Sequence, residues 1–390
     1  MDSENKIDKN IIKKIFKEHW EDFKKEYKSY DTEYYDEVIN KMLICGEKEG
    51  GYATYQCANC LEEKTVAFSC KSCFCLSCGK VYVDNWVEYV SKNLYAGVYY
   101  RHIVLTVPEE QRQYFYRERQ SGELLKELIN CGVETLNDAV ATYKKQKIKL
   151  GFIIVLQLVG RAGNYNPHLH ILMTSGGINE KDEWIKLNYF PYEMLHKKWE
   201  YHLFTMLKEK VKEPGIKEAI DKAWKKYPNG LVAYWEKGEI PRDTEGLARY
   251  LAKYVVSPPI AIKRILEYDG EKVRYYYNDH KTGQREELTV DVLTFIGKLV
   301  QTILPKGFHR IRYRGIQATC ILKKMTEKMA GLLKEVGEKI KGAYKVVRKS
   351  FRERIIESFK KDPFKCAKCG GIMKFVSIWH PKYGTIVAGR

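Results

Sequence analysis

The chain has 390 residues but no uninterrupted apolar stretch long enough to cross a bilayer. Its first ten residues are polar and mixed in charge, so they lack the apolar core of a signal peptide. We therefore expect no membrane partner and a cytoplasmic location. Because that compartment keeps thiols reduced, the eleven cysteines are not expected to form a disulfide framework.

Acidic residues are in the minority. Fifty Asp and Glu stand against sixty-eight Lys and Arg, which gives a net charge of +18. So large a positive excess makes a polyanion the natural partner, with nucleic acid favoured over an anionic membrane surface. The hydrophobic share of 44% is ordinary for a globular protein, and the length suffices for two or three domains.

A regular alternation of strands and helices is missing. Apolar and alternating runs predict strands at 99–107, 152–159, 168–174 and, as a hairpin, 272–290. Helical patterns cover 7–45, 111–147, 181–240, 321–361 and a shorter helix from Asp243 or Thr244 to about Ser257, which Pro258 and Pro259 end. This order favours an α+β core over a doubly wound sheet.

Two histidines share one predicted strand. His168 and His170 flank Leu169, so strand alternation places both imidazoles on the same face. Two neutral imidazoles side by side form half of a divalent-metal site. The plainer interpretation is a pair of surface histidines, which is the commoner case for an isolated His-x-His motif.

The neighbouring strand offers a third ligand. A polar, turn-rich segment joins the runs 152–159 and 168–174, so they are predicted to pair as an antiparallel hairpin. Folding it about its midpoint places Gln157 opposite the histidines, either as a ligand or as a polar residue at a strand edge. An imidazole and amide site with open positions suits magnesium or manganese, which would polarise a scissile phosphate.

Two tyrosines lie four residues apart on the short helix. This spacing places Tyr250 and Tyr254 on one face, where they also fit an ordinary core stripe. In the functional interpretation a phenolate attacks phosphorus, and a covalent phosphotyrosine stores the bond energy for rejoining. Arg249 and Lys253 lie beside them and could favour the phenolate or hold a phosphate.

Two Cys-x-x-Cys knuckles lie in a region short of periodic structure. Cys57 and Cys60 form the first, and Cys75 and Cys78 form the second. Paired knuckles at this spacing are a strong zinc signal, and these four thiols are the expected ligands. A four-cysteine site leaves no open position, so the zinc would be structural and would fold a small basic element that contacts DNA.

The remaining cysteines leave alternatives open. Cys70 and Cys73 lie between the two knuckles and could replace one of the four ligands or hold a second ion. Cys366 and Cys369 form another knuckle with no local mate, which could pair with the spare cysteines or bind nothing. Three isolated cysteines are interpreted as core residues: Cys45, Cys131 and Cys320.

A basic run near residue 310 is a candidate nucleic-acid contact. Arg310, Arg312 and Arg314 alternate with Ile311 and Tyr313, which places the arginines on one side of a strand where they could follow phosphates. Nearby aromatic side chains could stack unpaired bases. A solvated edge strand is the alternative.

These features, in this order, resemble the rolling-circle insertion-sequence transposases of the HUH two-tyrosine family, IS91 type. The sequence differs from the family pattern at Cys73 and Leu76, where arginine and proline are expected, so the choice of zinc ligands stays open. The resemblance covers most of the chain and is carried by YQCANC…SCKSCFCLSCG, RHIVLTVP, VLQLVGRAGNYNPHLHILMTSGG, ARYLAKYVVSPPI and LPKGFHRIRYRG.

The resemblance implies an HUH nuclease that cleaves single-stranded DNA with a divalent metal and leaves a 5′-phosphotyrosine. It makes His168 and His170 metal ligands and Tyr250 and Tyr254 nucleophiles, and Gln157 falls where a third ligand is expected. The DNA would be single-stranded or the hairpin ends of an insertion element, handled at a bacterial nucleoid.

The domains expected on this basis are a helical and zinc-binding domain, 1–92, an HUH catalytic domain, 93–320, and a basic helix with a cysteine tail, 321–390. Two alternatives stay open. One is a replication-initiator or relaxase-like nickase, and the other is a non-catalytic zinc DNA-binding protein derived from a transposase.

Overall fold

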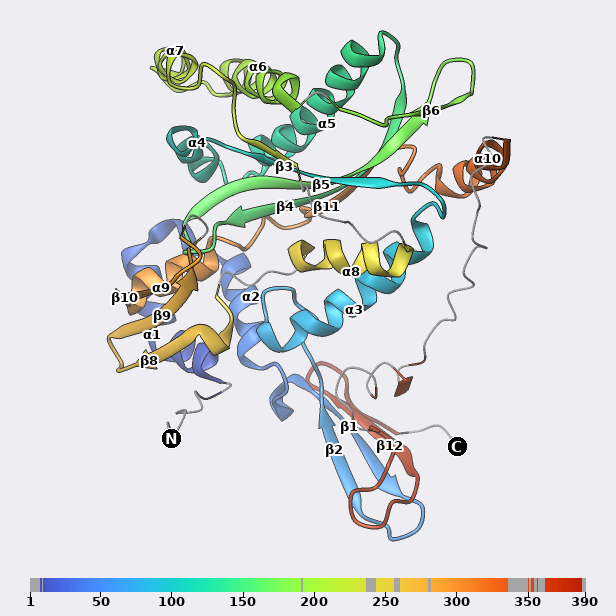
Figure 1. Ribbon diagram of the computed structural model, residues 1–390. Helices are drawn as coiled ribbons and strands as arrows, with labels where there is room; N and C mark the ends of the chain where they lie inside the picture. Colours follow the sequence, from blue (N-terminus) through green and yellow to red (C-terminus); the bar gives the residue numbers. More distant parts are fainter. Residues whose placement is uncertain are drawn as a thin grey trace.

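The computed structural model describes residues 8, 10–190, 192–235, 243–255, 260–279, 282–335, 350, 352–353, 356 and 362–387. In this part of the chain, helices and antiparallel sheets are mixed, which confirms the α+β class (Figure 1). None of the described helices is long and apolar enough to cross a membrane.

The largest sheet carries the candidate site. Its strands are β3 (Tyr100–Thr106), β4 (Lys149–Val159), β5 (Tyr165–Ile178), β6 (Trp184–Lys186), β7 (Ala233–Trp235) and β11 (Ile311–Gly315). The order is β11-β4-β5-β3-β7, with β6 paired to β5, and the pairs are antiparallel. The predicted hairpin of 152–159 and 168–174 is therefore confirmed as β4 and β5.

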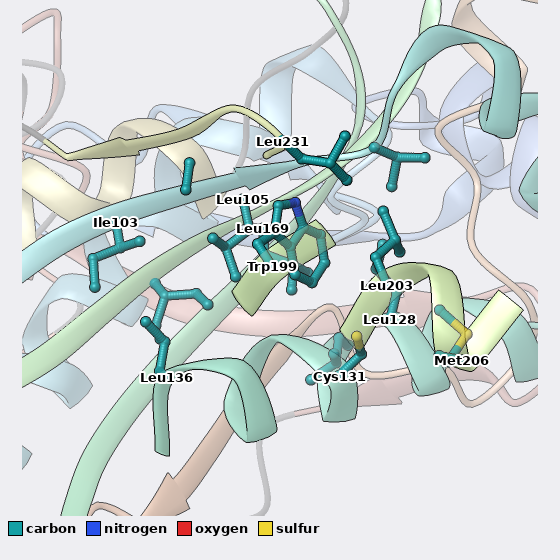
Figure 2. Packing of buried hydrophobic residues seen from close by; sticks show 14 of the residues in the cluster. Ile103, Leu105, Leu128, Cys131, Leu136, Leu169, Trp199, Leu203, Met206 and Leu231 are labelled. Carbon is teal, nitrogen blue, oxygen red and sulfur yellow. The ribbon is translucent and has the colours of Figure 1, made fainter. Parts of the chain in front are cut away.

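One face of this sheet packs on helices and forms the main core. The covering helices are α4 (Arg112–Arg117), α5 (Glu123–Lys144), α6 (Tyr192–Lys210) and α7 (Ile216–Lys226) (Figure 1). Leu105, Leu169 and Trp199 are buried together here, as Figure 2 shows. A Cβ at Gly132 of α5 would lie 2.6 Å from Leu169, so the missing side chain allows α5 to approach β5 closely.

The opposite face packs on α3 (Leu76–Asn93), α8 (Thr244–Val255) and α10 (Leu322–Glu335). Strand alternation sends Ile153 and Val155 of β4 and Leu172 of β5 to this side, where they meet Leu247 and Leu251 of α8. The helix α8 therefore lies directly over the centre of the sheet (Figure 1). The remainder of the basic helix expected at 321–361 lies largely outside the described residues.

A second core joins segments that are far apart in the sequence. It contains α1 (Ile11–Glu26), α2 (Glu33–Leu43) and α9 (Val292–Val300), with the sheet of β8 (Ile265–Tyr268), β9 (Lys272–Asn278) and β10 (Arg285–Asp291). The strands β9 and β10 confirm the hairpin predicted at 272–290. This core spans the boundary expected near residue 92, because residues 11–45 pack against residues 260–300.

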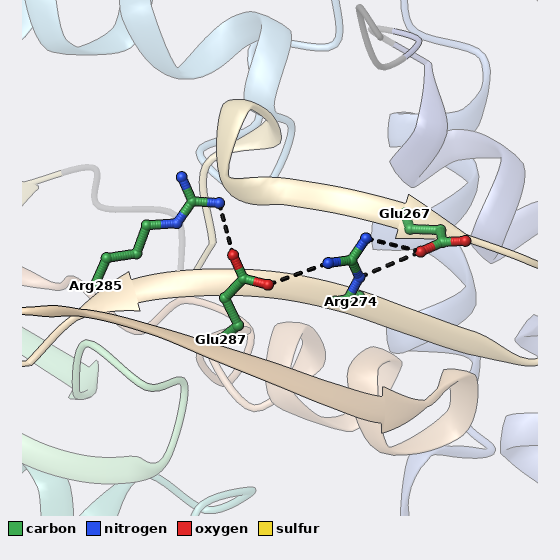
Figure 3. Close-up of polar contacts among 4 residues, drawn as sticks. All are labelled: Glu267, Arg274, Arg285 and Glu287. Atoms are coloured by element: carbon green, nitrogen blue, oxygen red, sulfur yellow. Dashed lines mark hydrogen bonds and ion pairs between the residues drawn. The ribbon is translucent and has the colours of Figure 1, made fainter. Parts of the chain in front are cut away.

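The β8–β10 sheet carries exposed ion pairs. Arg274 contacts Glu267 at 3.0 Å and Glu287 at 3.1 Å, and Arg285 contacts Glu287 at 2.8 Å (Figure 3). Because solvent screens exposed charges, these ion pairs contribute little to the stability of the fold.

A third sheet unites the two ends of the chain. Its strands are β1 (Tyr52–Cys57), β2 (Glu63–Ala67), β12 (Met373–His380) and β13 (Gly384–Val387), in the order β13-β12-β1-β2. It projects away from the central sheet, beyond α3 (Figure 1).

Candidate active site

The histidine pair lies in the middle of the central sheet, under α8. Side chains alternate between the two faces of the sheet along β5, so His168 and His170 lie on the same face as Leu172, towards α8. Leu169 and Ile171 lie on the other face and pack in the main core. Both histidines are buried, with 9% and 6% of their surface exposed, and their ring centroids are 5.0 Å apart. The predicted common face is confirmed.

Gln157 lies where the hairpin prediction places it. In the β4–β5 ladder Gln157 is paired with His168. Its amide nitrogen donates to the backbone oxygen of Tyr254 at 2.8 Å, so its Oε1 faces Nε2 of His170 at 3.1 Å. Gln157 therefore links the histidine pair to α8.

Both histidines are suited to holding a cation. Nδ1 of His168 lies 2.6 Å from the backbone oxygen of Asn166; donation there leaves the Nε2 lone pair for a ligand. Burial lowers the pKa of His168 and holds that of His170 well below its usual range, so both rings stay neutral. Two neutral imidazole nitrogens and an amide oxygen fit a divalent ion with open positions.

The tyrosines reach the same place from α8. The side chain of Asp243 accepts a hydrogen bond from the backbone N–H of Gly246 at 2.6 Å and so caps the helix, as one of the two predicted caps. The ring of Tyr254 stacks on His170, with centroids 3.8 Å apart and planes at 16°. Tyr250 lies one turn earlier, 6.1 Å from Tyr254 between ring centroids. The structure thus brings the two tyrosines and the two histidines together.

A third histidine belongs to this group, and sequence reasoning missed it. His102 of β3 is 1% exposed, and its Nε2 lies 3.0 Å from Nδ1 of His170. Its Nδ1 lies 2.8 Å from the hydroxyl of Tyr250. The signal was an imidazole within the apolar run RHIVLTV, on the face opposite Ile103 and Leu105. A continuous chain of contacts therefore runs from Gln157 through two histidines to Tyr250.

The two basic residues of α8 differ in their surroundings. The ammonium of Lys253 lies 4.9 Å from the ring centroid of Tyr250, close enough for a cation–π contact. Arg249 is exposed and pairs with Glu245 one turn earlier, at 2.8 Å. Lys253 therefore contacts a candidate nucleophile.

The three arginines near residue 310 lie at the edge strand. Arg310 precedes β11, in which Arg312 pairs with Ile154 and Arg314 with Phe152 of β4. Ile154 and Phe152 face the α5 side, so the alternation places Arg312 and Arg314 on the face of the sheet opposite the tyrosines.

The cysteines divide differently from the expected set. Cys75 and Cys78 meet Cys45 and Cys70, with all four ligand atoms within 4.8 Å of one another. A hydrogen bond with Cys70, helped by backbone donors of α3, lowers the pKa of Cys75 to about 5, which favours a thiolate. Cys73 is exposed and outside this cluster.

Cys57 and Cys60 form a second cluster with Cys366 and Cys369. The single site expected from both N-terminal knuckles is therefore divided, because the β1–β2 hairpin carries the first knuckle away from α3. Among the three cysteines assigned to the core, Cys131 and Cys45 are buried in hydrophobic cores and Cys320 is exposed. Cys45 is not isolated, because it also belongs to the first cysteine cluster.

Comparison with known proteins agrees with this layout. The family described as "Putative transposase" matches residues 151–324, and the family described as "Transposase zinc-binding domain" matches residues 15–107. The chain is 27% identical over 355 residues to the "Transposase for insertion sequence element IS801" of Pseudomonas savastanoi pv. phaseolicola, covering 87% of this chain and 83% of the relative. The two matched families and this relative together support an IS91-type transposase.

The chain is also similar to a second relative. The "Putative transposase y4qJ" of Sinorhizobium fredii is 25% identical over 317 residues, covering 77% of this chain and 78% of the relative. No solved structure matches the chain. The zinc-binding match and the cysteine clusters together support structural zinc in this protein.

Proposed function

We propose that this transposase nicks and rejoins single-stranded DNA through a 5′-phosphotyrosine, with magnesium or manganese held by His168, His170 and Gln157. The observation that carries the proposal is the chain of contacts from Gln157 through His170 and His102 to the hydroxyl of Tyr250. The similarity to transposases supports action on DNA in general. When bound, the divalent ion would polarise the scissile phosphate and offset its developing charge.

His170, itself a ligand, and His102 form a hydrogen-bond relay from the metal site to Tyr250. When Nε2 of His170 serves as a ligand, its Nδ1 carries the proton and donates to Nε2 of His102. The remaining proton of neutral His102 then lies on Nδ1, which donates to the oxygen of Tyr250. A donor at this oxygen favours the phenolate, the form that attacks phosphorus.

The chemistry needs two bond changes at one phosphorus. The oxygen of Tyr250 bonds to phosphorus while the bond to the 3′ oxygen breaks, and that oxygen leaves with a proton from solvent. The 5′ phosphate stays on tyrosine, so a 3′ hydroxyl can later attack it and restore a phosphodiester. Tyr254, on the same face of α8, supplies the nucleophile for a second strand or for the target.

A cavity beside Arg310 is our candidate for contact with unpaired DNA. It encloses about 460 Å³ between α2, α3 and the segment before β11. Aromatic side chains line it, among them Tyr82, Trp86, Phe308 and Tyr313. Aromatic rings beside a cationic group are suited to stacked bases and their phosphates. Phe74 lines this cavity and also packs against the core that contains the first cysteine cluster, where zinc would be structural.

Cleavage of end-labelled oligonucleotides tests the proposal. The oligonucleotides should be single-stranded and should carry the DNA sequences that flank the gene. With magnesium or manganese we expect a covalent protein adduct that keeps the 3′-end label and a free fragment that keeps the 5′-end label. With EDTA we expect neither. Binding without cleavage under all metal conditions would identify a non-catalytic DNA-binding protein and overturn the proposal.

His102 should control the reactivity of Tyr250. Without this donor the phenolate of Tyr250 loses a stabilising hydrogen bond, so His102→Phe should slow adduct formation about 100-fold. The rate of this variant should rise with pH, whereas His102→Asn, which keeps a donor, should lose less. Rates are measured from pH 6 to about 10 with the 3′-labelled strand.

His202→Asn is the matched control, because His202 lies on α6 across the sheet and bonds to Asp138. It should retain the parental rate and pH profile. Equal losses in His102→Phe and His102→Asn at every pH would assign His102 to packing alone.

A further inference from the structure

The third sheet places the two ends of the chain in register. Strand β1 pairs with β12 from Tyr52↔Trp379 to Cys57↔Met373, with one irregularity after Thr54. Figure 1 shows β12 beside β1, although more than 300 residues separate them in the sequence. Each of these strands belongs to a hairpin, and each is adjacent to a Cys-x-x-Cys knuckle.

The two knuckles have the same backbone form. The N–H of Leu61 donates to the oxygen of Cys57 at 3.2 Å, and the N–H of Gly370 donates to that of Cys366 at 3.0 Å. Leu61 and Gly370 both have positive φ, 59° and 75°, which turns the chain tightly after each second cysteine. A leucine in this conformation is strained, so the turn is imposed by its surroundings.

Backbone amides point at the sulfurs. The N–H of Asn59 lies 3.4 Å from Sγ of Cys57, and the N–H of Gly371 lies 3.4 Å from Sγ of Cys369. Donors of this kind orient thiolate ligands and offset their charge. A Cβ at Gly371 would lie 2.9 Å from the Asn59 side chain and 3.1 Å from Sγ of Cys57, so the missing side chain lets the two knuckles approach closely.

The sulfur spacing fits one zinc ion. Sγ of Cys57 lies 3.4 Å from that of Cys369, and Sγ of Cys60 lies 3.7 Å from that of Cys366. Four sulfurs at about 2.3 Å from a tetrahedral zinc are about 3.8 Å apart. A disulfide would need about 2.05 Å, so the arrangement is that of a shared ion and not of two bridges.

The sheet has little core of its own to hold it together. Its buried apolar cluster contains Cys57, Cys366 and Met373, and partly buried Tyr55 and Cys60 pack against it. A module this thin needs a metal or another crosslink to fold.

We propose that a second structural zinc ion, held by Cys57, Cys60, Cys366 and Cys369, fastens the C-terminal hairpin to the N-terminal one. The site is separate from the cluster of Cys45, Cys70, Cys75 and Cys78, and two of its ligands lie outside the matched zinc-binding domain, residues 15–107. It does not depend on the proposed nuclease function. The ion makes one small composite module out of the two ends of the chain.

Zinc content of the full-length chain tests this. Mass spectrometry of purified protein should find two zinc ions per chain, one in Cys366→Ser and one in Cys78→Ser. Cys320→Ser is the matched control, because Cys320 is exposed and outside both clusters, and it should retain two. One ion in the parent protein, or two in Cys366→Ser, would overturn the proposal.

Two further measurements locate the effect. In Cys366→Ser the β1 amides, Tyr52–Cys57, should lose protection against hydrogen exchange while those of β4 and β5 keep theirs. Should this variant not fold, titration of the parent chain with cobalt decides. Absorption of tetrahedral thiolate cobalt should saturate at two equivalents, and saturation at one would refute the second site.

Discussion

A protein in which Tyr250 and Tyr254 are both replaced by phenylalanine should form no covalent adduct with DNA while still binding it. Phenylalanine keeps the ring that packs under α8 and removes only the hydroxyl, so the fold and the stack on His170 are preserved. Without either oxygen the site has no phenolate to attack phosphorus, and we expect a loss of at least about 10⁴-fold, the scale for removing a nucleophile. Adducts are counted with a 3′-labelled single strand.

The single variants separate the two tyrosines. Tyr250 is the one whose oxygen contacts His102, so Tyr250→Phe should lose the first cleavage, whereas Tyr254→Phe should lose chiefly the second transfer. Tyr201→Phe, on the exposed face of α6, serves as control and should cleave at the parental rate. Adducts that persist in the double variant would refute the assignment of both nucleophiles.

Local patterns predicted much of the scaffold. The apolar runs around Gln157 and His168, joined by a polar turn, were sufficient to predict the β4–β5 hairpin and the residues that oppose each other in it. Alternation in a strand and spacing in a helix are properties of consecutive residues, so the common faces of the histidine pair and of the tyrosine pair followed from the sequence.

Contacts between segments that are far apart in the sequence could not be predicted from those local patterns. His102 joins the site because β3 pairs with β5, and a lone histidine in an apolar strand does not reveal which strand lies next to it. The division of the cysteines has the same cause. Cys366 reaches Cys60 only through the pairing of β12 with β1, so spacing along the chain favoured the nearer Cys75 and Cys78.

Loss of the imidazole of His170 should remove both metal binding and cleavage. His170 offers a ligand nitrogen next to Gln157 and also begins the hydrogen-bond relay to Tyr250. His170→Ala should therefore weaken both metal binding and the activation of Tyr250. We expect manganese affinity to fall by more than about 100-fold, the upper range for disturbing the surroundings of a metal, and adduct formation to fall at least as far. Manganese binding is measured by electron paramagnetic resonance of the free ion, which needs no DNA.

Two variants of Gln157, tested in the same manganese-binding assay, show whether this residue is a metal ligand or only a polar residue at a strand edge. Gln157→Glu keeps an oxygen toward His170 and should retain manganese, whereas Gln157→Ala should bind it more weakly, because only two imidazoles remain. His309→Ala, at an exposed position outside the site, should bind as the parent does. Unchanged manganese affinity in both His170→Ala and Gln157→Ala would mean that the buried histidines serve packing and that any catalytic ion is held elsewhere.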